Sequence, residues 1–303
     1  MENVTTITIT DPVVIGTRLD RFLAAQFPEY SRSYFQGLID EGLILVNGLH
    51  AKSSQTVKLS DVLTITFKSK TFNLAPMPVP FDIIDEQKDF IVVNKPAGLS
   101  VHPSLSAPDE ATLINGLLYR FSEMAHFDES ERPGIVHRLD KNTSGLLLIA
   151  RNPQAQAELA ALFKNRKIHK KYIALVHKHP DRSGSVDLPI GRHAIERHKM
   201  GVFGIESRSA LSHYRVLAYY ADASLLEVTI VTGRTHQIRV HMASIGHPIV
   251  GDAVYGTSST HIGRQALHSW YVAFNFRGKD YTYSCAIPHD MVQAINALKS
   301  KKI

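Results

Sequence analysis

The sequence predicts an α+β protein in two parts: a small helix-helix-hairpin unit, followed by a larger domain built on a mixed, largely antiparallel sheet. In the larger part, expected strands follow one another in pairs and do not alternate regularly with helices. A proline-rich segment, Lys68 to Phe81, separates the two parts and reads as a semi-rigid linker. We therefore place the first domain at residues 1–75, the linker at 76–80 and the second domain at 81–303.

The N-terminal unit begins with two expected helices. Apolar residues in Thr17 to Phe27 have helical spacing, and Thr17 with Asp20 forms a weak capping box. A second short helix is expected to begin near Ser31, a plausible N-cap. A strand then ends at the hairpin signal Asn47-Gly48, and the returning strand is expected near Val57 to Phe67.

Three arginines in this unit are candidate contacts to RNA phosphates. They lie at or near the starts of the two expected helices: Arg18, Arg21 and Arg32. A guanidinium group there can bind a phosphate, but the acids of the unit nearly balance its bases, so a solvated surface explains these arginines equally well.

The larger domain shows a mixed pattern of helices and strands. Buried strands are expected at Phe90 to Asn94 and Gly145 to Ala150, and further strands at Tyr172 to Val176, Ser212 to Tyr219 and Leu225 to Val231. Helices are expected at Thr112 to Phe121, Gln154 to Arg166, around Gln237 to Met242, and at Asp290 to Lys299. A final hairpin joins Leu267 to Phe276 with Tyr281 to Ile287.

The composition is that of a globular, mildly basic protein. The chain has 303 residues, 44% of them hydrophobic, and a formal net charge of +6, which favours a polyanionic partner. The single cysteine, Cys285, cannot form an internal disulfide and indicates a reducing compartment. No signal-like start or long apolar run is present, so we expect a cytoplasmic protein that makes no use of a membrane.

Common catalytic and cofactor signatures are missing from the sequence. It contains no GxxxxGK[ST], GxGxxG, GxSxG or HExxH motif, so phosphate-loop, dinucleotide, nucleophile-elbow and zincin chemistry have no local support. Despite 16 histidines, no ligand set has metal-binding spacing, and we expect neither a metal nor a cofactor.

A basic cluster runs from Lys164 to Lys171, directly before an expected strand, and includes Lys167 and Lys170. Cations at the end of a helix are favourable in any protein. The number of basic residues here exceeds what capping requires, so the cluster favours binding to a nucleic-acid backbone.

Asp140 stands in a polar turn within GIVHRLDKNTSGLLLIAR. The ordinary interpretation is that its side chain caps the turn, because Asp, Asn, Thr and Ser readily bond nearby backbone groups. The wider sequence context favours a second interpretation.

Three stretches occur in the order and spacing of one family: FIVVNKPAGLSVHP, GIVHRLDKNTSGLLLIAR and LEVTIVTGRTHQIRVHMASIGHPIVGD. With them, nearly the whole chain closely resembles the RluA-type pseudouridine synthases, and its domain order is like that of the RluD branch. The N-terminal unit resembles the alpha-L RNA-binding module of members that act on the large ribosomal subunit. The HRLD and GRTHQIRVH motifs are highly specific as a pair, whereas the alpha-L module also occurs in unrelated RNA-binding proteins.

The resemblance implies isomerisation of uridine to pseudouridine in RNA, most readily large-subunit ribosomal RNA. This reaction breaks the N1–C1′ bond and joins C5 to C1′ without net redox change, so no cofactor is required. It implies that Asp140 is the reacting carboxylate, by attack on C1′, attack on C6 or removal of a C2′ proton. The expected partner is RNA and not DNA, and the expected state is a monomer.

The same resemblance assigns other site residues. A reactive carboxylate must be ionised, and Arg239 of HQIR matches the family cation beside it, with Arg234 as a competitor. Tyr172 matches the family tyrosine that stacks on the uracil and is also a candidate acid or base for the C5 proton. Leu267 matches a leucine of the base pocket, although either residue could be simple core.

The target base must leave its stack to react, and Arg138 is a candidate for filling the vacated space, with a phosphate contact as the alternative. The sequence SLSAPDEAT after His102-Pro103 departs from the glycine-richer loop of many relatives.

Three other functions remain open from the sequence. Transfer RNA is the second candidate substrate. A ribohydrolase would normally need a second carboxylate near Asp140, which the sequence does not supply. A non-catalytic RNA-binding or ribosome-assembly factor would explain the basic patches without any role for Asp140.

Overall fold

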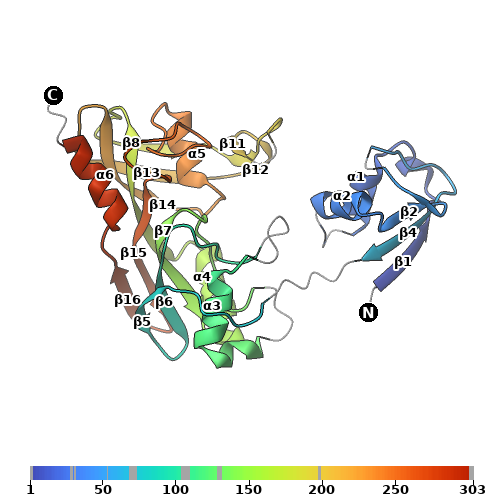
Figure 1. Cartoon of the computed structure of the whole chain (residues 1–303), viewed down its shortest axis with the longest axis horizontal. Coiled ribbons are helices and arrows are strands. Elements are labelled where there is room, and N and C mark those ends of the chain that lie inside the picture. The colour runs from blue at the N-terminus through green and yellow to red at the C-terminus, as the bar shows by residue number, and fades with distance from the viewer. Residues whose placement is uncertain are drawn as a thin grey trace. The chain divides into compact units, whose positions relative to one another are not determined.

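The computed structural model describes residues 3–27, 30, 32–52, 54–67, 74–103, 110–127, 132–196 and 199–299. The chain divides into two compact units, Met1–Thr71 and Phe72–Ile303 (Figure 1). Each unit has its own hydrophobic core. No helix in the described ranges is long and apolar enough to cross a membrane.

The N-terminal unit packs two helices on a small antiparallel sheet. The helices are α1 (Leu19–Gln26) and α2 (Arg32–Asp40), preceded by the 3-10 turn η1 (Pro12–Val14). The strands are β1 (Asn3–Thr8), β2 (Ile44–Val46), β3 (Leu49–His50) and β4 (Val62–Phe67), in the order β1-β4-β2-β3. The core contains Phe35, Leu19 and Leu63, all fully buried.

Some local expectations for this unit require correction. The predicted capping box is wrong, because Arg18 is the N-cap of α1 and the buried Asp20 carboxylate instead bonds Arg18, Arg32 and Gln36. The Asn47-Gly48 hairpin is present, but the strand that returns from it is the short β3, and β4 begins only at Val62. Strand β1 was not predicted, and Ser31 lies outside the described residues.

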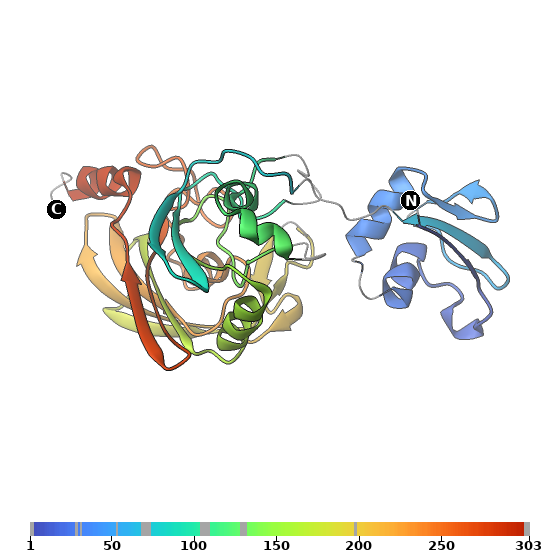
Figure 2. The same ribbon diagram turned by 90° about the horizontal axis from the view of Figure 1, so that it is seen from below.

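The C-terminal unit is built on one large, curved sheet (Figure 2). Its helices are α3 (Leu113–Arg120), α4 (Pro153–Lys164), α5 (Gln237–Ser244) and α6 (His289–Lys299), with the 3-10 turn η2 (Ser122–His126). The strands of the large sheet are β5 (Asp82–Glu86), β6 (Phe90–Lys95), β7 (Ser144–Ala150), β8 (Ile168–His177), β9 (Ser183–Asp187), β13 (Leu211–Tyr219), β14 (Ala223–Ile230), β15 (Leu267–Phe276) and β16 (Lys279–Ser284). Their order is β5-β6-β7-β15-β8-β14-β13-β9, with β16 paired to β15.

Both faces of the central strands are buried, which explains their nearly continuous apolar sequences. Alternate residues of β6 and β7, such as Val93 and Leu147, join a core that includes α3, α5 and α6. The residues between them, such as Val92 and Leu148, join a second core that includes α4. Figures 1 and 2 show α6 at the opposite end of the unit from α3, although both helices contribute to the first core. This mixed sheet with helices confirms the predicted α+β class.

Pairing is antiparallel except where β7 meets β15. There, His268 and Ser269 lie beside Ser144 and Gly145 in parallel. Gly145 has φ 115°, and a Cβ at this position would lie 2.1 Å from the Ser269 carbonyl oxygen, so only glycine fits. This contact fixes the start of β7, a few residues after Asp140.

A second, three-stranded sheet was not predicted. It consists of β10 (Ile190–Arg192), β11 (Met200–Val202) and β12 (Ile205–Arg208), in the order β11-β10-β12. Met200 and Val202 pack with Tyr255 against a small cluster that includes Val240 of α5. The small sheet is therefore anchored next to the helix that carries Arg239.

Candidate active site

Two neighbouring cavities meet at Asp140. The first has a volume of about 450 Å³ and lies between the loop before β7, strand β8 and the segment 230–239. The second, about 430 Å³, lies between the same loop and the segment 251–254. Both are lined by Arg138, Leu139, Asp140, His236 and Arg239. A ligand can therefore reach Asp140 from either cavity.

The Asp140 carboxylate does not cap its turn. The turn is closed by the backbone, where the Thr143 amide donates to the Asp140 carbonyl oxygen at 2.9 Å. The side chain instead accepts a hydrogen bond from Arg239 Nη1 to Oδ2 at 3.1 Å. The capping interpretation of Asp140 thus lacks its contact among the described residues.

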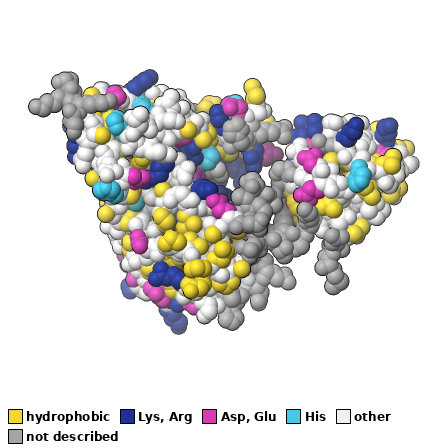
Figure 3. All heavy atoms as spheres, viewed as in Figure 1, with side chains coloured by type: hydrophobic (Ala, Val, Ile, Leu, Met, Phe, Trp, Pro, Cys, Tyr) yellow, Lys and Arg dark blue, Asp and Glu magenta, His cyan; other side chains and the backbone are white. Residues whose placement is uncertain are grey.

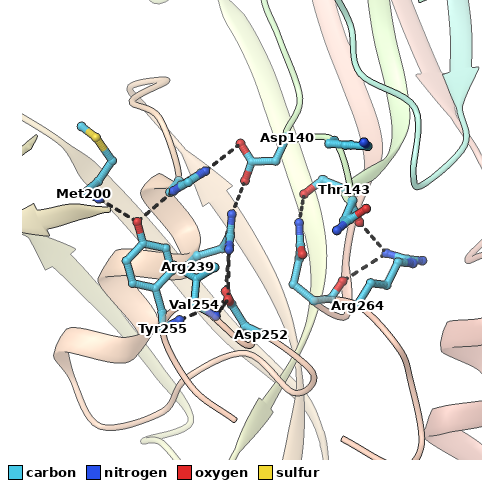
Figure 4. Close-up of polar contacts among 12 residues, drawn as sticks. Asp140, Thr143, Met200, Arg239, Asp252, Val254, Tyr255 and Arg264 are labelled. Carbon is cyan, nitrogen blue, oxygen red and sulfur yellow. Dashed lines mark hydrogen bonds and ion pairs between the residues drawn. The ribbon is translucent and has the colours of Figure 1, made fainter. Parts of the chain in front are cut away.

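Arg239 is held rigidly between two carboxylates. Its Nε and Nη2 donate to Asp252 Oδ2 and Oδ1 at 2.7 and 3.0 Å, which leaves Nη1 for Asp140 (Figure 4). Burial by itself lowers the pKa of the guanidinium, but the contacts with Asp252 and Asp140 outweigh it and raise the pKa. The Val254 and Tyr255 amides fix Asp252 in turn. Arg234, the competing candidate, directs its Nε to the Ser209 carbonyl oxygen.

Lys95 stabilises the turn that carries Asp140 through hydrogen bonds to backbone carbonyl groups. This side chain is fully buried, and Nζ donates to the carbonyl oxygens of Pro96, Leu99 and Lys141 at 2.8, 2.8 and 3.0 Å. Burial, with a contribution from Arg264, lowers the pKa of the Lys95 amine to about 7, although Asp140 opposes the shift.

Arg264 also stabilises this turn through a backbone carbonyl group. Its Nη1 donates to the Asn142 carbonyl oxygen at 3.1 Å, while Nε and Nη2 bind Asp290 of α6. Next to it, Gln265 Nε2 donates to Thr143 Oγ1. The position of Asp140 is therefore determined by groups from several distant segments.

Tyr172 and Leu267 form an apolar part of the first cavity. Both are buried, and they stand on the paired strands β8 and β15, where Tyr172 lies opposite Ser269. Burial raises the pKa of the Tyr172 phenol, and the charge of Asp140 raises it further despite a hydrogen bond with Ser269. The ring is thus a neutral, flat surface a short distance from the carboxylate.

His236 and Tyr255 complete the surroundings of Asp140. His236 Nε2 lies 3.9 Å from Asp140 Oδ1, while its Nδ1 is 2.8 Å from the Tyr255 hydroxyl. The Met200 amide donates to the same hydroxyl at 2.8 Å. Burial is the main cause that lowers the pKa of His236, so its ring is neutral at neutral pH.

One end of the first cavity is lined by cations. Lys170, Arg234 and the exposed Arg166 and Lys164 all line it. Lys170 is 8% exposed; its amine lies 5.2 Å from the Phe163 ring centre and has no acidic partner in the described structure. Burial lowers its pKa to about 8.

The residues of the predicted basic cluster do not all face the cavity, because neighbouring residues of β8 point to opposite faces of the sheet. Lys164, Arg166 and Lys170 face the cavity, whereas Lys171 binds Glu227 on the opposite side of the sheet. Lys167 is exposed but does not line either cavity.

In the N-terminal unit, the candidate arginines differ in their surroundings. Arg18 and Arg32 bind the buried Asp20 at 3.1 and 2.8 Å, so their guanidinium groups are held in place. Arg21 is exposed on α1. Figure 3 shows Lys and Arg side chains along one edge of this unit in the face in view.

Sequence reasoning gave no role to several residues of this site, among them Lys95, His236, Asp252 and Tyr255. The first three lie within the motif stretches, which was the available signal, but nothing in local spacing indicated their contacts. The SLSAPDEAT departure falls largely outside the described residues.

Comparison with protein families gives two matches. A family described as RNA pseudouridylate synthase matches residues 89–244, and the S4 domain matches residues 17–63. The S4 domain binds RNA, which assigns this role to the N-terminal unit.

Similar proteins cover nearly the whole chain. An RNA pseudouridine synthase of Chloroflexus aurantiacus, named as uncharacterised, is 40% identical over 97% of this chain and 94% of its own. The ribosomal large subunit pseudouridine synthase D of Zymomonas mobilis is 38% identical over 94% of both chains. Among solved structures, human RNA pseudouridylate synthase domain containing 4 has a TM-score of 0.59 and 25% identity, covering 72% of this chain and 93% of its own. With the folds, motifs and matches in agreement, this chain belongs to the RluA family of RNA pseudouridine synthases and is an isomerase with an N-terminal S4 domain.

Proposed function

We propose that this enzyme converts particular uridines of large-subunit ribosomal RNA to pseudouridine, with Asp140 as the reacting carboxylate. The choice of ribosomal RNA is supported by the large-subunit synthase of Zymomonas mobilis, which matches both units of the chain. Transfer RNA remains the second candidate because relatives of similar identity are named only as RNA pseudouridine synthases.

The position of Asp140 is the observation that carries the proposal. Arg239 binds only Oδ2, so Oδ1 is left toward the cavity. In the reaction the N1–C1′ bond breaks, the uracil turns, the C5–C1′ bond forms, and the C5 proton is lost as N1 gains one. Atoms and electrons balance within the substrate, so the protein has to supply only a positioned carboxylate, proton transfer and a pocket.

The first cavity suits an extruded uracil. Tyr172 offers a ring face for stacking, and Leu267 closes the apolar side. Burial raises the pKa of Tyr172, so its ring is an uncharged stacking surface at neutral pH, and proton transfer at C5 is the second role that we assign to it. Moving the target base out of its RNA stack costs a few kcal/mol. The exposed Arg138 lines the cavity, and we assign to it the filling of the space that the base leaves.

The cationic end of the cavity suits the RNA backbone. Lys170 is nearly buried without an acidic partner, an arrangement that is costly unless an anion binds there. Arg166 and Arg234 lie close enough for their charges to repel each other, and a phosphate would relieve that repulsion. We assign further backbone contacts to the exposed Lys167 and, in the S4 domain, to Arg18, Arg21 and Arg32.

The test is to map pseudouridines in ribosomal and transfer RNA from cells with and without this protein. Loss of specific sites in large-subunit ribosomal RNA, restored by the wild-type gene but not by Asp140→Asn, is expected. Loss of sites only in transfer RNA would reject the proposed substrate, and restoration by Asp140→Asn would reject the proposed role of Asp140.

A further inference from the structure

Asp140 Oδ1 and His236 Nε2 face each other across a gap. Their separation of 3.9 Å is too long for a hydrogen bond. Oδ2 is already bound by Arg239, and no other partner of Oδ1 or Nε2 is found among the residues that the structure describes. Both residues line both cavities.

The hydrogen bonds around Tyr255 and the negative charge of Asp140 together favour one tautomer of His236. Because the Met200 amide donates to the Tyr255 oxygen, that hydroxyl can direct its own hydrogen to His236 Nδ1. The neutral ring then carries its proton on Nε2, the nitrogen that faces the carboxylate. The opposite tautomer would place a lone pair against the negative charge of Asp140.

This arrangement fixes a donor and an acceptor at a defined spacing. An oxygen atom about 2.8–3.0 Å from both atoms would fit between them. It must donate to the carboxylate and accept from Nε2–H, which is the behaviour of a hydroxyl group. A uracil carbonyl cannot donate, and a phosphate oxygen would be repelled by Asp140.

We infer that Asp140 Oδ1 and His236 Nε2 together bind the ribose 2′-hydroxyl of the target uridine. This inference rests on the proposed function, in which Asp140 acts at or beside the N1–C1′ bond. The 2′-hydroxyl is attached to the carbon next to C1′, so a carboxylate that reaches the reacting atoms also reaches this group. The 2′-hydroxyl is also the group by which a protein distinguishes RNA from DNA.

His236 is held in place before any substrate binds. It has φ 57° at the start of α5, a left-handed conformation that histidine tolerates better than most residues. Its ring packs edge-on against Tyr255, with ring centres 5.6 Å apart, and Tyr255 in turn lies 5.1 Å from the Arg239 guanidinium. A rigid donor loses little entropy when the hydroxyl binds.

The test is a double-substitution cycle between enzyme and substrate. Two RNAs differ only at the target ribose, which carries either a hydroxyl or a hydrogen at C2′, around a uridine that the wild-type enzyme converts. Single-turnover rates with saturating enzyme are measured for wild type, His236→Ala, His236→Gln and the control His213→Ala. His213 is exposed on β13 and lines neither cavity.

Wild type should lose about tenfold or more in rate on the deoxyuridine RNA, the usual effect of one hydrogen bond to a charged group. His236→Ala should lose a similar factor on the ribose RNA and little further on the deoxyuridine RNA. His236→Gln should recover part of the rate, because its amide N–H extends to the place of Nε2, and His213→Ala should behave as wild type. Thermal unfolding of each variant separates these effects from misfolding.

Equal fold-losses for His236→Ala on both RNAs would overturn the inference, as would an undiminished wild-type rate on the deoxyuridine RNA. If the deoxyuridine RNA reacts too slowly to time, its Kd from competition replaces the rate in the same cycle. Because every measurement uses a uridine that the wild type converts, these outcomes leave the proposed function standing. That proposal fails separately, if Asp140→Asn still forms pseudouridine.

Discussion

Replacing Asp140 with Asn should abolish catalysis with little effect on the fold. Asn nearly preserves the size of the side chain but removes its charge and its nucleophilicity. Arg239 keeps both hydrogen bonds to Asp252, at 2.7 and 3.0 Å, so it is not left as an unpaired buried charge. The lost charge on one hydrogen bond should cost about 1 kcal/mol of stability.

The rate loss should be far larger, on the order of a thousandfold or more, because removing the reacting group of an enzyme typically has effects of this size or above. The assay is single-turnover pseudouridine formation with saturating protein, since saturation excludes weakened binding as the cause. Asp181→Asn, an exposed aspartate outside both cavities, is the matched control. A rate within tenfold of wild type for Asp140→Asn would refute the reasoning.

Three further predictions concern charge. Changing Lys164, Arg166 and Lys170 together to Gln should flatten the slope of log affinity against log salt by about two units, whereas Lys171→Gln should leave it unchanged. The same slope for the triple variant and the wild type would place these three residues away from RNA. Because burial lowers the pKa of the Lys170 amine to about 8 and only the charged form attracts phosphate, RNA affinity should fall as pH rises through 8, and Lys170→Gln should remove that decline in Kd titrations. Although burial alone would raise the pKa of Asp20, hydrogen bonds from Arg18, Arg32 and Gln36 lower it from 3.8 to about 2. The ionised carboxylate therefore stabilises the fold above pH 3.8, and this contribution is lost as pH falls toward 2. Asp20→Asn should lower the free energy of unfolding at neutral pH by about 2 kcal/mol, measured by thermal unfolding.

The elements that the sequence predicted well are those with a strong hydrophobic pattern. Strands β6 and β7 are buried on both faces, so their sequences are apolar runs that any packing arrangement would require. Strand β12 is fully exposed and β11 only half-buried, so neither has a pattern of apolar residues to detect. The position of β11 depends instead on contacts with Tyr255 and α5, which are far away in the sequence, and β12 is held by its pairing with β10.

Asp20 illustrates how a local rule fails when tertiary contacts compete with it. The Thr17 and Asp20 spacing satisfies the capping-box pattern, yet the carboxylate turns inward to Arg32 and Gln36 of the next helix. At the candidate active site, the family motifs pointed to Asp140 and Arg239, whose direct contact spans 99 positions of sequence. The roles of Asp252 and His236 follow only from that folded arrangement.

If Asp140 is the reacting carboxylate, as we propose, the pairing of Arg239 with Asp252 explains how it can be fixed and still meet the substrate. A guanidinium has five N–H donors and readily binds both oxygens of one carboxylate. If Asp140 were the only acid present, Arg239 would be expected to bind it in this way and occupy both of its oxygens. Asp252 takes the Nε and Nη2 positions instead, so Asp140 is held through Nη1 alone at 3.1 Å. The buried second aspartate thus keeps the charge that stabilises Asp140 while leaving one carboxylate oxygen available for the substrate.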